Sequence, residues 1–205
     1  MIHDPEVALL QTLQAQWTLF QTNAATLIPD VYADESAANQ ADLLAWWAKA
    51  PTVLITAAYA LAPPQLPLLW VKTLNDDEVP DRQFVGRSRV PVGGLYAEST
   101  TLACHLEVGI FATNANEVRW LALWVRWALW SATHTLETQY GLFQQRLSAG
   151  PLEPVPDSAQ DVVFPFWRRV WFQAQHEDTW RVTPTPGALV QATSVEVQAD
   201  AAETP

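Results

Sequence analysis

The longest helical pattern of apolar positions in the chain runs from Asn114 to Leu147. It begins with Asn114 and, three residues later, Glu117, a variant of the capping box in which Asn replaces the usual Ser or Thr. It closes near Gly141, a residue type that commonly ends a helix. These signals predict one long helix over about 115–140, around which we expect the rest of the fold to pack.

The predicted helix carries two apolar stripes. The first is aliphatic, repeats at three- and four-residue steps, and consists of Val118, Leu121, Val125, Ala128, Ala132 and Leu136. The second lies beside it and consists of Trp120, Trp124 and Trp127. One stripe ordinarily packs on a sheet, whereas a second stripe of tryptophans is either further core or an interface with another chain. The sequence leaves both alternatives open for the tryptophans.

A membrane span is rejected for this helix. The apolar run from Trp120 to Trp130 has only about half of the ~20 residues that a span needs, and it contains Arg126. We therefore expect no membrane partner.

Two more helices are predicted near the N-terminus. Asp4 before Pro5 gives an N-cap with proline at the first helical position, and apolar residues at helical spacing follow, which predicts a helix over 5–21. The segment 35–49 is also compatible with a helix, which Pro51 would end.

The middle of the chain shows strand patterns. Short runs of apolar and β-branched residues predict buried strands over 52–59 and 68–73. The acidic segment 75–81 is predicted to be a loop. Farther along, the pair Gly93-Gly94 can form the tight turn of a hairpin.

The clearest alternation lies in 101–112, which predicts a half-buried strand with Cys104 on its apolar face. After the long helix, 144–158 has no regular pattern. A last long strand is predicted over 162–174, with a short continuation over 180–182.

This order of elements predicts an α+β fold. We expect a mixed or antiparallel β-sheet of about four to six strands, covered on one face by helices that include the long Trp-rich helix. Residues 1–182 are predicted to form a single α+β domain. Residues 183–205 contain Pro, Thr, Ala, Gln and acids without any aromatic residue, which predicts an extended or disordered acidic C-terminal tail.

Composition narrows the possible functions. The net charge of −11, from 22 acids against 11 bases, disfavours a protein that grips phosphate backbones, although it permits a position close to DNA without binding. The single cysteine excludes an internal disulfide framework and a multi-cysteine zinc site. The N-terminal segment carries acids where a secretory signal carries bases, so we expect the protein to be made in a cytoplasm.

No catalytic constellation is evident in the sequence. Cys104 and His105 are neighbours on a predicted strand and project to opposite faces, so they cannot act as a pair. The four histidines show no metal-binding spacing, and the acidic run around Asp76 lacks the glycine and the terminal glutamate of a calcium loop. We therefore expect no catalytic, cofactor or metal site.

Besides the pair Arg168 and Arg169, the only basic concentration in this acidic chain consists of Arg82, Arg87 and Arg89. They either pair on the surface with acids of their own chain, or they contact an acidic patch of a neighbouring subunit. Together with the tryptophans at 120, 124 and 127, they are the candidate interface residues.

The strand and helix over 108–147 resemble the neck and tail-terminator proteins of tailed bacteriophages. The segments that carry the resemblance are the turn Ala112-Thr113-Asn114, the helix start Glu117 to Leu121, Leu136-Glu137, Gly141-Leu142 and Leu147-Ser148. The returning strand over 163–175 and the segment 177–180 fit the same layout. The resemblance covers about half of the chain and rests on structural positions rather than on a catalytic motif.

The resemblance implies a non-enzymatic virion protein that forms a closed ring of about six copies at the head-tail junction. Such a tail terminator caps the tail tube and joins it to the neck, and DNA passes nearby without specific binding. The alternatives are another neck or head-completion protein, an assembly factor, or an enzyme with an undisclosed site.

Overall fold

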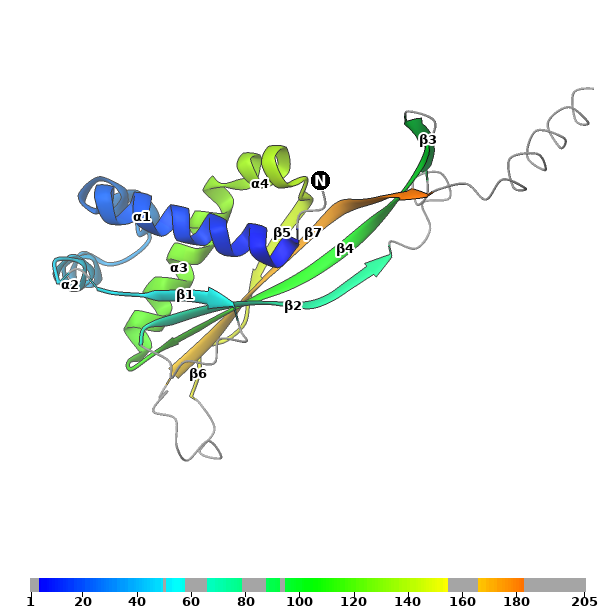
Figure 1. Cartoon of the computed structure of the whole chain (residues 1–205). Helices are drawn as coiled ribbons and strands as arrows, with labels where there is room; N and C mark the ends of the chain where they lie inside the picture. The colour runs from blue at the N-terminus through cyan, green and yellow to red at the C-terminus, as the bar shows by residue number, and fades with distance from the viewer. Residues whose placement is uncertain are drawn as a thin grey trace, which may run out of the picture. The chain divides into compact units, whose positions relative to one another are not determined.

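The computed structural model describes residues 4–49, 51–57, 66–78, 88–92, 95–154 and 166–182 (Figure 1). The elements along the chain are α1 (Pro5–Val31), α2 (Ala37–Trp47), β1 (Leu54–Ala57), β2 (Leu68–Glu78), β3 (Ser88–Val92), β4 (Leu95–Ala112), α3 (Ala115–Ser131), α4 (Thr133–Tyr140), β5 (Phe143–Ala149), β6 (Glu153–Pro154) and β7 (Phe166–Val182).

The strands form one mixed sheet. Five strands follow one another in the order β1-β2-β4-β7-β5, while β3 pairs with β4 and β6 pairs with β7. β1 and β2 are parallel, whereas the β3–β4, β5–β7 and β6–β7 pairs are antiparallel. The predicted α+β fold with a mixed sheet is therefore confirmed.

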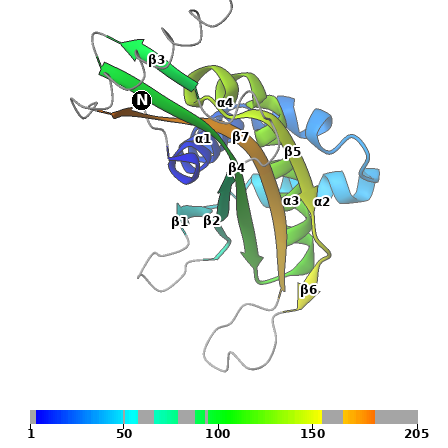
Figure 2. The same cartoon turned by 90° about the vertical axis from the view of Figure 1, so that its right-hand side faces the viewer.

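The chain divides into two compact units, and the single domain predicted over 1–182 stays a prediction. The larger unit, 3–77 with 102–176, contains the four helices found among the described residues, and these helices lie on one face of its sheet (Figures 1 and 2). In the smaller unit the structure describes β3, residues 95–101 of β4 and residues 177–182 of β7. There Val92 pairs with Leu95, so a two-residue connection joins β3 to β4, as the predicted hairpin requires. The predicted tail, 183–205, lies outside the described residues.

The predicted helix over 115–140 is two helices. Its start is confirmed, because the Asn114 side chain accepts a hydrogen bond of 2.9 Å from the Glu117 backbone N–H. Its end is also confirmed, with Gly141 in the left-handed region at φ 70°. The break falls at Ala132, and the Thr133 hydroxyl beside it donates to the Trp130 carbonyl at 2.8 Å, a side-chain bond that competes with the regular helical pattern.

The first helix is longer than predicted and kinked. α1 continues to Val31, but Asn23 has non-helical φ and ψ near the predicted end at residue 21. The Asn23 amide donates to the Leu19 carbonyl at 2.9 Å, so a local side-chain bond accompanies the kink. α2 agrees with the predicted second helix to within two residues at each end.

Several strand predictions need correction. β2 continues to Glu78 through part of the segment predicted as an acidic loop. The segment predicted to be irregular contains β5 and β6, which are stabilised by pairing with β7 rather than by strong hydrophobic alternation. The predicted continuation of the last strand over 180–182 is confirmed, since β7 extends to Val182.

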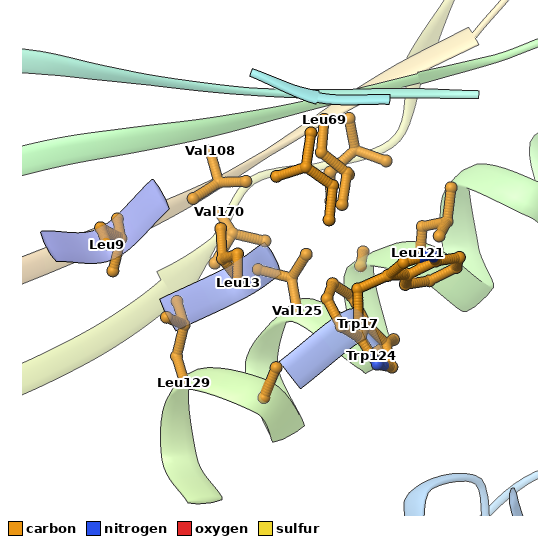
Figure 3. Packing of buried hydrophobic residues seen from close by; sticks show 14 of the residues in the cluster. Leu9, Leu13, Trp17, Leu69, Val108, Leu121, Trp124, Val125, Leu129 and Val170 are labelled. Atoms are coloured by element: carbon orange, nitrogen blue, oxygen red, sulfur yellow. The ribbon is translucent and has the colours of Figure 1, made fainter. Parts of the chain in front are cut away.

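The core lies between the sheet and the helices (Figure 3). Leu9 and Leu13 of α1 belong to this core together with Val108 of β4 and Val170 of β7, and all four are fully buried. The aliphatic stripe of the long helix is buried as predicted, with exposures of 0–1% from Val118 to Leu136. Cys104 is also fully buried, as its parity with Leu106 and Val108 predicted. The hydrophobic alternation therefore identified the core face of β4.

Candidate interaction surfaces

The tryptophan stripe of α3 belongs mainly to the core of the subunit, which is one of the two alternatives that the sequence left open. Trp124 has no exposed surface and Trp120 is 8% exposed, while Trp127 is half-buried and packs against the core. Trp124 meets Trp17 of α1 edge to face at 4.9 Å between ring centroids, and Trp17 in turn lies 4.9 Å from Trp47 of α2. The partners of the stripe are thus aromatic residues of the same chain.

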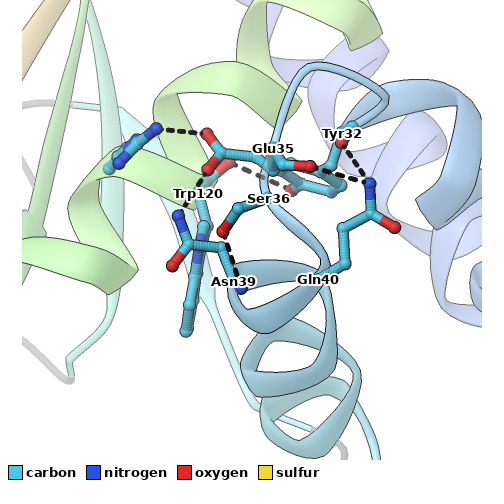
Figure 4. Close-up of polar contacts among 7 residues, drawn as sticks. Tyr32, Glu35, Ser36, Asn39, Gln40 and Trp120 are labelled. Carbon is cyan, nitrogen blue, oxygen red and sulfur yellow. Dashed lines mark hydrogen bonds and ion pairs between the residues drawn. The ribbon is translucent and has the colours of Figure 1, made fainter.

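Hydrogen bonds and an ion pair join α2 and the turn between α1 and α2 to α3 (Figure 4). The buried Tyr32 hydroxyl donates to the Trp120 carbonyl at 3.0 Å, and Arg119 pairs with the Glu35 carboxylate at 2.6 Å. Burial, and second the negative charge of Glu35, raise the pKa of Tyr32, so its hydroxyl remains a donor. From α2, the Trp46 indole N–H donates to the Glu117 carboxylate at 3.1 Å. These bonds fix the turn between α1 and α2 on α3.

The structure leaves the arginine hypothesis untested. Arg82 and Arg87 lie outside the described residues. Arg89 lies on β3, where its backbone pairs with that of Glu98 on β4. These arginines therefore stay candidate interface residues.

A tryptophan outside the predicted stripe has the greatest exposure among the exposed large apolar side chains of the described residues. Trp130, in the last turn of α3, is 77% exposed. Spacing alone did not distinguish Trp130 from the buried tryptophans, because it follows the stripe at helical spacing. Its apolar surface is available to another molecule.

A second aromatic surface lies on the face of the sheet opposite the helices. It consists of Trp70 of β2, Phe111 of β4 and Trp167 of β7, which we call the aromatic row. Their ring centroids are 5.7 Å and 5.8 Å apart, and all three side chains are half-buried. Gly109 permits this arrangement, because a Cβ at that position would lie 1.4 Å from the Trp70 indole nitrogen.

Two cations extend the aromatic row. The Lys72 ammonium lies 5.1 Å from the centre of the Trp70 ring, and the Arg169 guanidinium lies 4.0 Å from that of Trp167. Arg169 also approaches the buried Glu107 carboxylate at 4.0 Å. The indole nitrogens of Trp70 and Trp167 and the Arg169 Nε atom are buried without an acceptor within the described part of the chain. The exposed parts of the half-buried rings, together with the two cations, leave apolar and positively charged surface on this face.

We compared the chain with protein-family models and with curated proteins. No family model matches the sequence, and no similar curated protein was found. Among the residues that the structure describes, none of the helices has both the length and the apolar character that crossing a bilayer requires.

Proposed function

We propose that this chain is a non-enzymatic structural subunit of a bacteriophage virion that forms a ring at the head-tail junction, as the tail terminator. The observation that carries the ring is the presence of two unlike apolar surfaces, the aromatic row on the sheet and the exposed Trp130 at the end of α3. The position in the virion rests on the resemblance of the segment 108–147 to neck and tail-terminator proteins.

Two unlike surfaces are what a ring of identical subunits requires. In a closed ring each contact is heterologous, so one patch of each subunit meets a different patch of the next. Tryptophan and arginine are also the residue types that contribute most to binding energy at interfaces. The aromatic row with Arg169 would be one patch, and Trp130 would belong to the other.

The charge of the chain is compatible with a channel for DNA. With a net charge of −11, the subunit offers no counterion-release gain to a phosphate backbone, so DNA would pass without specific binding. The tail tube and the neck proteins would be the permanent partners of the ring.

The test is native mass spectrometry and sedimentation of the full chain in the presence of a chelator. We expect a ring of about six copies, and we expect Trp130→Ser to release monomers without a change in melting temperature. Leu19→Ser is the matched control, since Leu19 is also an exposed apolar residue on a helix, at 49% exposure, and lies on α1. It should leave the ring intact.

Two outcomes would contradict the proposal. If the parent chain remains monomeric at high concentration, it does not assemble into a ring by itself. If the ring persists in both Trp130→Ser and Trp167→Ala, these two surfaces do not form the interface. Detection of the chain in purified virions separates a virion subunit from an assembly factor that leaves before completion.

A further inference from the structure

Three metal-ligating side chains that are far apart in the sequence meet on neighbouring strands of the sheet. Asp76 is on β2, Cys104 on β4 and His176 on β7, and these strands are adjacent in the sheet order. One ligand atom from each residue lies within 4.8 Å of the others, and the His176 Nε2 atom is 3.8 Å from an Asp76 carboxylate oxygen. All three residues belong to the larger compact unit.

The burial of this group is unusual for polar side chains. Cys104 has no exposed surface, while the side chains of His176 and Asp76 are 11% and 37% exposed. The buried His176 Nε2 atom has no hydrogen-bond partner in the described part of the chain, and its separation from Asp76 exceeds hydrogen-bonding distance. A buried, unpaired imidazole nitrogen therefore points to a missing partner.

A nucleophilic thiol is not a good interpretation of the cluster. Burial, and second the charge of Asp76, raise the pKa of the Cys104 thiol to about 11, which disfavours the reactive thiolate. The thiol donates a long hydrogen bond of 3.5 Å to the Ala174 carbonyl rather than to His176. Without a cation nearby, the thiol remains protonated and is inaccessible to a substrate.

The geometry points to a binding site for a divalent transition-metal cation of the zinc type, held by Asp76, Cys104 and His176. Thiolate sulfur, imidazole nitrogen and carboxylate oxygen are the three ligand types of Zn²⁺. Tetrahedral coordination at the usual bond lengths separates ligand atoms by about 3.4–3.6 Å, so small side-chain rotations would close the present arrangement. A thiolate and a carboxylate neutralise the charge of the cation, which suits a buried site.

Asp76 gives the site an opening to solvent, and the fourth coordination position would hold water. The cation would bind β2, β4 and β7 to one another, so its role is to stabilise the sheet rather than to catalyse a reaction. The site is independent of the proposed ring, because it uses neither the aromatic row nor Trp130.

Cobalt substitution of the full chain tests the site directly. After removal of metals with a chelator, titration with Co²⁺ should give one ion per chain, a thiolate-to-cobalt charge-transfer band and the intense d–d bands of tetrahedral coordination. Zn²⁺ should displace the cobalt and raise the melting temperature. Cys104→Ser should abolish the charge-transfer band, whereas the control His105→Gln, on the next residue of β4, should keep it.

A further variant guards against loss of folding. If Cys104→Ser or His176→Gln fails to fold, Asp76→Asn tests the site instead, because Asp76 is partly exposed. This variant should weaken Co²⁺ binding at least ~10-fold and retain the melting transition. Absence of saturable Co²⁺ binding by the parent, or binding that Asp76→Asn and Cys104→Ser leave unchanged, would overturn the inference.

Discussion

Tryptophans lie on both faces of the sheet in the larger unit, but their exposure to solvent differs between the two faces. On the helix-covered face, Trp124 has no exposed surface and contacts the aromatic rings of Trp17 and Phe20 on α1. On the opposite face, Trp70 and Trp167 are half-buried. The aromatic surface on the first face is buried within the fold, whereas part of the aromatic surface on the second face is accessible to another molecule. A tryptophan-rich sequence therefore does not by itself locate an interface.

The largest effect is expected on the helix-covered face. Trp124→Ala would leave a cavity between α1 and α3 and should lower the free energy of unfolding by ~3–5 kcal/mol. Denaturant unfolding monitored by circular dichroism measures this loss, with Trp130→Ala as the exposed control on the same helix. A loss below ~1 kcal/mol would mean that the enclosed tryptophan contributes no more than a surface residue.

An intermediate effect is expected from Gly109→Ala on the opposite face. The new Cβ would overlap the Trp70 indole, and displacement of the ring should cost about 1–3 kcal/mol of unfolding free energy. The cost should largely disappear in a Trp70→Ala background, because the overlapping ring is then absent. Equal costs in the two backgrounds would show that backbone conformation, and not the close approach of Trp70, requires glycine here.

A smaller effect is expected from Arg119→Ala in the helical layer. The Arg119 side chain is 50% exposed, so loss of its pair with Glu35 should cost no more than about 1 kcal/mol of unfolding free energy. Arg126→Ala, an exposed arginine two turns later on α3, is the matched control and should cost less. Identical denaturation midpoints for the two variants would assign no net stabilisation to the pair.

The smallest effect on folding is expected from the double variant Arg87→Glu and Arg89→Glu. Each substitution should change the unfolding free energy by no more than ~0.5 kcal/mol if the arginines lie at the surface, while charge reversal at an interface would dissociate a ring. Sedimentation velocity of parent and variant measures this difference. An unchanged ring would exclude these arginines from the interface and leave the aromatic row and Trp130 as the candidates.

The sequence predicted those features that depend on neighbouring residues. The cap at Asn114, the stop at Gly141 and the buried face of β4 were all evident from spacing, because each is determined within a few residues. The break at Ala132 was missed, since the side-chain bonds of Ser131 and Thr133 compete with a pattern that is otherwise continuous.

Features that depend on contacts between distant segments could not be predicted from the sequence. The tryptophan stripe remained ambiguous because its covering residues, such as Trp17 and Trp47, come from other helices. The cluster of Asp76, Cys104 and His176 has no characteristic spacing, since strand pairing alone brings it together. One signal was available: extending the last strand in its alternation would have placed His176 on the buried face of Phe172 and Ala174.

The strand order also has a consequence for synthesis on the ribosome. β7 lies between β4 and β5 in the sheet, yet it is the last strand to emerge among those described. Until β7 emerges, β5 has no partner strand among the described residues, and the helices pack against an incomplete sheet. The nascent chain therefore cannot complete its fold progressively from the N-terminus, and closure of the sheet must await a contact of high sequence separation.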